Sequence, residues 1–180
     1  MMEHINFEVK ARTRRQDAIR EWLLANGASL RGTDWQTDTY FNIPEGQGRL
    51  KLREGNIENN LIHYRRADNP EARVSDVALS PVADTDSLKR VLERALGIKT
   101  EVRKQREIYF IANVKFHLDD LENFGQFVEI EAVANNFDTR EEDLKEQCSR
   151  YMEIFGIQPG DVLADSYSDM VMRKSAGNTR

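Results

Sequence analysis

Most of the chain alternates apolar and polar residues with a period of two, the pattern typical of β-strands with one buried face. Short polar segments at residues 44–48, 54–60 and 68–71 separate the early runs, as in an antiparallel meander. The runs predict strands at residues 5–11, 37–42, 49–54, 61–67, 74–80, 101–112, 115–121, 126–134 and, more weakly, 167–172.

Three segments instead carry apolar residues at helical spacing, and a glycine follows each of them. They cover residues 13–26, 86–96 and 139–155. Two of these segments open with the pattern of a capping box, Thr13 with Gln16 and Thr139 with Glu142. The sequence therefore predicts three amphipathic helices, each with one face buried against the sheet.

The bulk properties favour a single polar domain. No linker, repeat or low-complexity stretch divides the chain, so we expect one α+β domain at residues 1–174 and a loose tail at 175–180. The net charge of −5 disfavours binding to nucleic acid or to an anionic membrane. The single Cys148 excludes an intrachain disulfide, and neither a signal peptide nor a membrane-spanning run is present, so we expect a cytoplasmic protein.

Charged residues make up 32 % of the chain, above the usual share of about a quarter, and they alternate with apolar residues on the predicted strands. Leu50 and Leu52, for example, alternate with Arg49, Lys51 and Arg53. A solvent-facing sheet surface also carries charges, but such surfaces usually mix the two signs. Like charges spaced roughly 7 Å apart along one face cost energy unless an anion lies between them.

A charged face turned inward would explain this pattern. If about eight such strands closed into a barrel, its interior could hold one small ligand, with the apolar face outside under the helices. Arginine and lysine would bind phosphate oxygens, and carboxylates would supply the oxygen ligands that Mg²⁺ or Mn²⁺ prefers. A basic face opposite an acidic face fits a complex of metal and polyphosphate.

Six short motifs follow one another between residues 5 and 172. They read NFEVK at 6–10, QTDTYF at 36–41 with GRLKLR at 48–53, LIHYRR at 61–66, VRKQR at 102–106, HLD at 117–119 with GQFVEIE at 125–131, and SYSD at 166–169. In this order they resemble the motifs of the CYTH superfamily, also called triphosphate tunnel metalloenzymes. That superfamily includes class IV adenylyl cyclases, thiamine triphosphatases and inorganic triphosphatases.

The resemblance implies a closed eight-stranded antiparallel β-barrel, the triphosphate tunnel, with amphipathic helices packed outside. By analogy the substrate triphosphate would be bound by Lys51, Arg53, Arg66, Lys104 and Arg106. Mg²⁺ or Mn²⁺ would be held by Glu8, Asp119, Glu129 and Glu131. Lys10 would contact the substrate or position the attacking group, and Arg65 competes with Arg66 because a one-residue slip exchanges their faces.

One departure from the family pattern concerns the metal. Asn6 stands where the family's opening Glu-x-Glu-x-Lys strand has its first Glu, so it keeps an oxygen ligand but loses a negative charge. The three histidines, His117 among them, lack the spacing of metal ligands and are expected to be incidental.

The resemblance leaves several functions open. The leading expectation is metal-dependent hydrolysis of tripolyphosphate or of an organic triphosphate such as thiamine triphosphate or ATP. The alternatives are a class IV-type adenylyl cyclase and, supported by Asn6, a non-catalytic module that binds polyphosphate or nucleotide. The predicted acids argue against the last, because anion binding alone needs bases. A homodimer is also left open.

Overall fold

The computed structural model describes residues 6–66, 75–134 and 139–177. Eight antiparallel strands form one sheet: β1 (Asn6–Arg12), β2 (Ser29–Phe41), β3 (Arg49–Glu54), β4 (Asn60–Arg66), β5 (Ser75–Pro81), β6 (Ile98–Ile111), β7 (Val114–Leu121) and β8 (Gly125–Val133). The helices are α1 (Gln16–Ala25), α2 (Thr85–Leu96), α3 (Glu141–Phe155) and α4 (Tyr167–Gly177), with a short 3₁₀ turn η1 (Pro159–Asp161). None of the described helices is long and apolar enough to cross a lipid bilayer.

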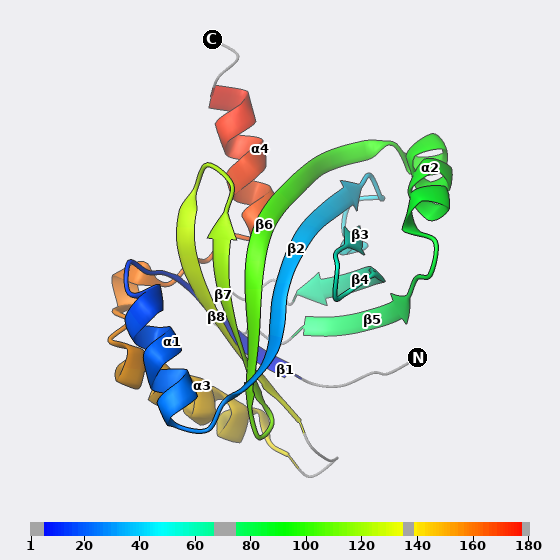
Figure 1. The fold of residues 1–180 in the computed structure, drawn as a ribbon. Helices are drawn as coiled ribbons and strands as arrows, with labels where there is room; N and C mark the ends of the chain where they lie inside the picture. Colours follow the sequence, from blue (N-terminus) through cyan, green and yellow to red (C-terminus); the bar gives the residue numbers. More distant parts are fainter. Residues whose placement is uncertain (1–5, 67–74, 135–138, 178–180) are drawn as a thin grey trace.

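The strands follow the order β1-β8-β7-β6-β2-β3-β4-β5 and curve around a central cavity. Figure 1 shows the long strands β2 and β6 bending, with β3, β4 and β5 turned back beside them. Residues from all eight strands line the cavity. The predicted α+β fold, with an eight-stranded antiparallel sheet and helices outside it, is confirmed. Within the described residues, β1 and β5 end the strand order and do not pair with each other.

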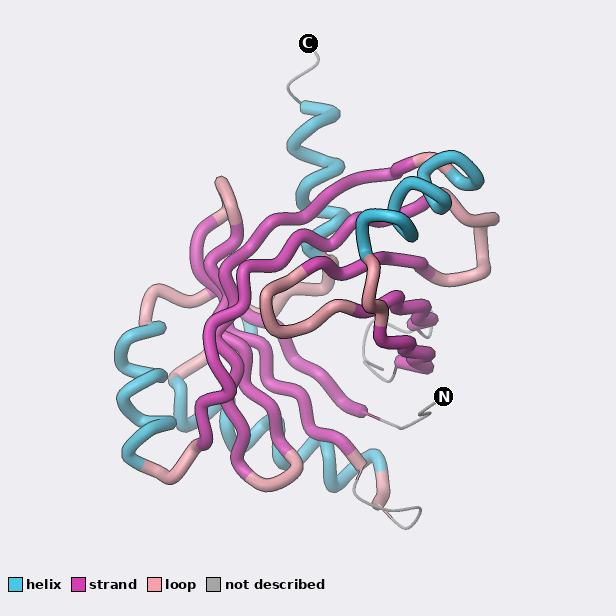
Figure 2. The backbone as a smooth tube through the Cα atoms, turned by 45° about the vertical axis from the view of Figure 1, so that its right-hand side comes forward, coloured by secondary structure: helices cyan, strands magenta, loops and turns pink. Residues whose placement is uncertain are grey.

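The apolar faces of β1, β7 and β8 form the main core together with α1 and α3. Phe7 and Val9 of β1 are buried there, as are Val128 and Ile130 of β8. Figure 2, in a view turned by 45°, shows the helices around the curved sheet. Because side chains alternate along a strand, this packing turns the polar positions of the same strands toward the cavity. Cys148 lies on the buried face of α3, as its apolar stripe predicts.

The predicted strand at residues 167–172 is wrong, because this segment forms helix α4. The Oγ atom of Ser166 accepts a hydrogen bond from the Asp169 backbone N–H at 3.2 Å, and the Asp169 carboxylate accepts one from the Ser166 N–H at 3.1 Å. This reciprocal pair is a capping box, which begins a helix. The helix continues to Gly177, into the segment that the sequence predicts as a tail. Helix α4, unlike α1 and α3, packs on the cavity side, where Tyr167 and Met170 belong to a second hydrophobic cluster.

The two capping boxes predicted from the sequence are also wrong. Helix α1 begins at Gln16, with Arg15 in the capping position and without a side-chain cap. The Gln16 amide instead donates hydrogen bonds to the carbonyl oxygens of Asp119 and Phe127, at 2.8 and 2.9 Å, in the buried interface with β7 and β8. Helix α3 likewise begins at Glu141 with Arg140 in the capping position and no side-chain cap.

Strand β2 begins at Ser29, eight residues before the predicted start at Thr37. Its extra length pairs with β6, with a register shift between Leu30 and Gly32. Asp34 and Gln36 are polar and almost fully buried in this stretch, and the Gln36 amide donates to the Asp34 carboxylate at 2.8 Å. Buried polar residues interrupt the apolar alternation, so the pattern does not reveal the strand.

Candidate active site

A cavity of about 190 Å³ opens on the concave side of the sheet. Most of the side chains that line it are ionisable, and they include Glu8, Lys10, Asp38, Lys51, Arg53, Glu58, Lys104, Arg106, Lys115, His117, Glu129 and Glu131. The inward charges predicted from the alternation are therefore found there. A polar interior thus accommodates part of the unusually high charge content.

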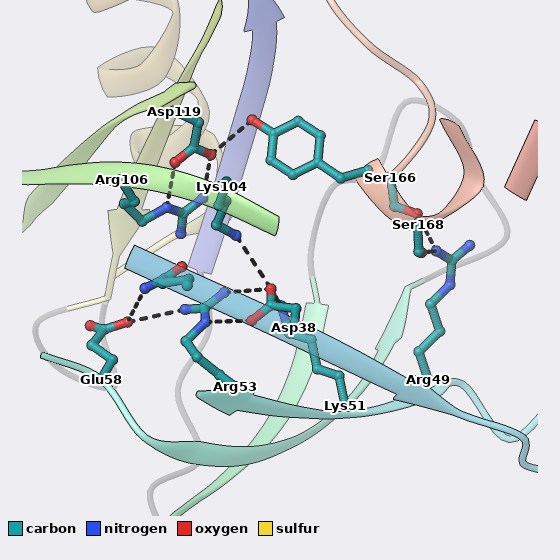
Figure 3. A network of polar contacts seen from close by, with 12 residues as sticks. Asp38, Arg49, Lys51, Arg53, Glu58, Lys104, Arg106, Asp119, Ser166 and Ser168 are labelled. Carbon is teal, nitrogen blue, oxygen red and sulfur yellow. Dashed lines mark hydrogen bonds and ion pairs between the residues drawn. The ribbon is translucent and has the colours of Figure 1, made fainter. Parts of the chain in front are cut away.

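Three cations meet at one buried carboxylate, that of Asp38 on β2. The Lys51 ammonium lies 2.8 Å from an Asp38 oxygen, the Arg53 guanidinium donates to both oxygens at 2.8 and 3.0 Å, and the Lys104 ammonium lies 3.3 Å away (Figure 3). Burial alone would raise the pKa of Asp38, but these cations hold it well below its usual value. We call these four side chains the Asp38 cluster. Glu58 also lies 3.0 Å from Arg53, so three cations meet two carboxylates, and one positive charge is left for an anionic ligand.

Lys104 is the member of the Asp38 cluster whose charged form its surroundings disfavour. Burial and the nearby charge of Arg106 lower the pKa of Lys104 to about 7, although the Asp38 carboxylate acts in the opposite direction. Removing an ammonium group from water disfavours its charged form. A polyanion bound beside Lys104 would supply the counter-charge that a single carboxylate does not.

Arg106 and Asp119 form a second buried pair next to the Asp38 cluster. Two hydrogen bonds of 2.6 Å join the guanidinium to the Asp119 carboxylate, which also accepts a 2.8 Å hydrogen bond from the Tyr167 hydroxyl (Figure 3). Burial acts to raise the pKa of Asp119, but Arg106 lowers it to about 2. Asp119 is fully buried and is not among the residues that line the cavity. The same Arg106 nitrogen that contacts Asp119 also lies 3.4 Å from Glu129, so Arg106 bridges the buried Asp119 and a carboxylate that lines the cavity.

The opposite wall of the cavity is acidic and comes from β1 and β8. In the strand register Glu8 faces Glu131, and Lys10 faces Glu129. The Lys10 ammonium lies 2.8 Å from Glu129, whose other oxygen is 2.9 Å from Nδ1 of His117. Glu8 and Glu131 are like charges directly across a strand pair, an arrangement that destabilises a sheet unless a cation compensates it. The Lys115 ammonium is 3.5 Å from Glu131 and compensates part of that charge.

Asn6 supplies an unusual oxygen atom at this wall. Its side-chain N–H donates to Glu131 at 2.7 Å, and the residue is only 4 % exposed. Among the described residues, the Asn6 Oδ1 atom has no hydrogen-bond partner. A buried oxygen without a donor is costly, and cation binding is one way to satisfy it.

The donors on the acidic wall fit a hard divalent cation. Carboxylate and amide oxygens are the ligands that Mg²⁺ and Mn²⁺ prefer, and Glu8, Glu131 and Asn6 all line the cavity. In the part of the chain that the structure describes, no three His, Cys, Asp or Glu side chains already form a metal-binding group. A metal at this wall would therefore require the Asn6 oxygen or a small rearrangement of the carboxylates.

The aromatic ring of Tyr167, the first residue of α4, links the two walls. The Lys10 ammonium lies 4.2 Å from the ring centroid, and the Lys104 ammonium lies 5.5 Å from it. Both distances are within the range of a cation–π interaction. Arg49, which the charge alternation places on the same face as Lys51, instead binds Ser166, Ser168 and Asp169 and so fixes the start of α4 (Figure 3).

Two predicted positions on β4 have different outcomes. Arg65 is exposed. Arg66 continues the strand register of Ile62 and Tyr64, which line the cavity, but its side chain lies outside the described residues. The choice of Arg66 as a phosphate ligand therefore stays a prediction.

Sequence reasoning missed Asp38, Glu58, Tyr64 and Tyr167 as cavity residues, and took His117 as incidental. Asp38 and Tyr40 alternate with threonines on β2, so the period-two pattern contains a signal for them. Glu58 lies in a loop, where no periodicity applies, and reaches Arg53 at 3.0 Å. Because the sequence predicts a strand at residues 167–172, it does not indicate Tyr167 as a cavity residue.

Comparison with known proteins agrees with this arrangement. The CYTH domain family model matches residues 4–167. A Methanocaldococcus jannaschii protein named "putative adenylate cyclase" is 23 % identical over 177 residues, which is 92 % of this chain and 98 % of that protein. The solved structure of the PH1012 protein from Pyrococcus horikoshii OT3 is 26 % identical, covers 93 % of this chain and 98 % of its own, and superposes with a TM-score of 0.79.

A more distant structure shares the fold. HpAC1 from Hippeastrum, described as a "putative adenylyl cyclase" with a dominant triphosphatase activity, is 17 % identical, with a TM-score of 0.61 over 97 % of this chain and 96 % of its own. The family match spans nearly the whole chain, and it confirms the family resemblance of the sequence motifs. The protein belongs to the CYTH domain family.

Proposed function

We propose that this protein is a metal-dependent hydrolase that binds the triphosphate group of its substrate in the sheet cavity and releases phosphate. The observation that carries the proposal is the Asp38 cluster, in which Lys51, Arg53 and Lys104 converge on one carboxylate at the cavity. A chain of phosphates offers several anionic oxygens along a short length. Lysine and arginine bind such oxygens as point charges and as rigid forks, respectively.

The acidic wall would hold the metal. Glu8, Glu129 and Glu131 are its carboxylates, and the Oδ1 atom of Asn6 is a fourth oxygen donor. A bound Mg²⁺ or Mn²⁺ would neutralise charge on the transferring phosphoryl group and orient the attacking water. Asp119, expected in this set from the family resemblance, is instead proposed to position Arg106 toward the phosphates.

The chain's own residues would divide the remaining work. Lys51, Arg53, Lys104 and Arg106 would neutralise the phosphate oxygens and hold the chain of phosphates along the cavity. Lys10 lies between the acidic Glu129 and the ring of Tyr167, so its ammonium is fixed at the boundary of the two walls. There it would contact the substrate or position the attacking group.

A product assay tests this proposal. The purified protein is incubated with Mg²⁺ or Mn²⁺ and, separately, with tripolyphosphate, thiamine triphosphate and ATP, and the products are resolved. We expect phosphate release from at least one substrate, and at least tenfold weaker binding of that substrate by Arg53→Ala. Arg103→Ala is the matched control, because Arg103 lies on β6 with a side chain that is 62 % exposed. No phosphate from any substrate with either metal would contradict the hydrolase proposal.

The metal assignment needs a readout other than turnover. Calorimetric titration of the protein with Mn²⁺ should show weaker binding in Glu131→Gln and tighter binding in Asn6→Glu, since metal affinity follows the charge of the ligands. Equal Mn²⁺ affinity in wild type and both variants would remove this wall as the metal site.

Adenylyl cyclase activity is the second candidate, and the name of the M. jannaschii relative favours it. In that reaction the ribose 3′-hydroxyl attacks the α-phosphorus of ATP, and pyrophosphate leaves. The same assay separates the two reactions, because the cyclase yields cyclic AMP and pyrophosphate. Thermal stabilisation by triphosphates without any product would instead support the non-catalytic binding module.

A further inference from the structure

One side of the cavity differs from the rest. Strands β4 and β5 present Ile62, Tyr64, Val77 and Leu79 to it, and none of these side chains is charged. In the strand register Ile62 faces Leu79, and Tyr64 faces Val77, so the four residues form two adjacent cross-strand pairs. We call them the apolar wall. Among the side chains that the structure describes, the inward positions of β4 and β5 contribute no charge to the cavity.

The apolar wall adjoins the Asp38 cluster at a single side chain. The Lys51 ammonium, 2.8 Å from Asp38, also lies 5.6 Å from the ring centroid of Tyr40 and 5.9 Å from that of Tyr64. The cationic part of the cavity lining and its aromatic and aliphatic part therefore meet at Lys51. The apolar wall lies beside the cationic strand β3, because Ile62 pairs directly with Lys51 in the strand register.

The apolar wall packs in part within a second hydrophobic cluster, which includes Tyr167 and Met170 of α4, and in part it faces the cavity. Ile62 and Tyr64 are almost fully buried, but Val77 and Leu79 are partly exposed while they line the cavity. Apolar surface that faces water in a cavity is stabilised when an apolar group of a ligand covers it. Inorganic tripolyphosphate is charged along its whole length, so it cannot do so.

We propose that the apolar wall receives the organic group of the substrate, and that the protein acts on an organic triphosphate carrying a ring system in preference to inorganic tripolyphosphate. This inference rests on the proposed function, because it requires the phosphate chain to bind at the Asp38 cluster. The ring stacks beside Tyr64 and over the aliphatic pair of Ile62 and Leu79, and the phosphates extend past Lys51 toward Lys104 and Arg106. Rings stacked on aromatic side chains are a recurrent mode of ligand recognition.

The test measures equilibrium binding of tripolyphosphate, thiamine triphosphate and the β,γ-methylene analogue of ATP by calorimetry. The wild-type protein is compared with the double variant Val77→Thr/Leu79→Gln. We expect at least one organic triphosphate to bind wild type on the order of tenfold more tightly than tripolyphosphate. The double variant should lose that advantage while its affinity for tripolyphosphate stays within about twofold of wild type. Val91→Thr on α2, where Val91 is 61 % exposed, is the matched control and should change nothing.

The outcomes separate this inference from the proposed function. If tripolyphosphate binds wild type as tightly as both organic ligands, or if the double variant weakens all three equally, the apolar wall has no role in selecting substrate. In that case a loss of tripolyphosphate binding in Arg53→Ala would still support the proposed phosphate site. If none of the three ligands binds wild type, the proposed function and this inference both fail. If the double variant does not fold, the single variant Leu79→Ala replaces it, because Leu79 is partly exposed. The preference of the wild-type protein between organic and inorganic triphosphates also tests the inference.

Discussion

At the scale of single residues, the ion pair of Arg106 and Asp119 joins two charged side chains of the family motifs. Both groups are buried, and their two hydrogen bonds measure 2.6 Å. Removing one partner of such a pair leaves an uncompensated buried charge. We therefore expect Asp119→Ala to lower the free energy of unfolding by about 3–5 kcal/mol, measured by urea denaturation.

The neighbouring Asp120 provides the control, because it is exposed and Asp120→Ala should be nearly neutral. A stable Asp119→Ala variant with impaired Mn²⁺ binding would contradict the structural role and return Asp119 to the metal ligands.

Lys104 gives a prediction about pH. Its pKa is about 7 in the free protein, mainly because it is buried, whereas a bound triphosphate would raise the pKa toward or above the ordinary value. Above pH 7 the free protein holds this lysine mostly neutral while the complex keeps it charged, so binding takes up a proton. The affinity for triphosphate should therefore fall as the pH rises above about 7, by up to tenfold for each pH unit.

Calorimetric titration at pH 8 in two buffers of different ionisation enthalpy measures this proton uptake. Lys104→Arg stays charged and should remove the uptake, whereas His117→Gln should retain it, since the pKa of His117 is already lowered by burial and by Arg106. Equal uptake in wild type and Lys104→Arg would show that another group titrates.

At the scale of secondary structure elements, Gln16 connects α1 to the sheet. Its amide donates to carbonyl oxygens of both β7 and β8, and it is 5 % exposed. Replacing it removes two buried hydrogen bonds, so Gln16→Leu should lower the free energy of unfolding by about 1–3 kcal/mol, measured by urea denaturation. Asp17→Ala, one residue further and with a side chain that is 94 % exposed, should change the stability by less than about 0.5 kcal/mol. Equal stability of the two variants would show that α1 docks without this contact.

Element boundaries also show where local patterns are insufficient. The strands with one apolar face, such as β1 and β8, were predicted nearly to the residue, because their alternation is uninterrupted. The sequence predicts a strand where α4 lies, because the apolar stripe of this helix is short. The capping box of Ser166 and Asp169 is not apparent from the alternation. The early part of β2 was missed because Asp34 and Gln36 face inward.

At the scale of the whole molecule, Lys51, Arg53 and Lys104 share the Asp38 carboxylate in the cavity, so an anionic ligand bound there should stabilise the entire fold. Tripolyphosphate at about 100 times its dissociation constant should raise the free energy of unfolding by about 2.7 kcal/mol, by mass action. Urea denaturation with and without the ligand measures this effect. Arg53→Ala should show much less stabilisation at the same ligand concentration, and sulfate at equal ionic strength should have little effect in either protein. Stabilisation of Arg53→Ala equal to that of wild type would place the ligand outside the cavity.

Alternation along the sequence is sufficient to predict which side chains face inward. Alternation along a strand is a local property, so the inward position of Lys51, Arg53, Glu129 and Glu131 follows once one face is known to be apolar and buried. The motifs in their order also determined the family, and with it the expectation of a triphosphate site.

Which charges meet depends on the packing of the whole fold. Lys10 pairs with Glu129, and Asp38 with Lys51, Arg53 and Lys104, because their strands pair in a particular order and register. The same register places Asp119 beside Arg106 and groups the apolar wall on β4 and β5. Alternation cannot specify these partners, because it is identical for every pairing that keeps the same face inward, and only packing and hydrogen bonding across strands distinguish them.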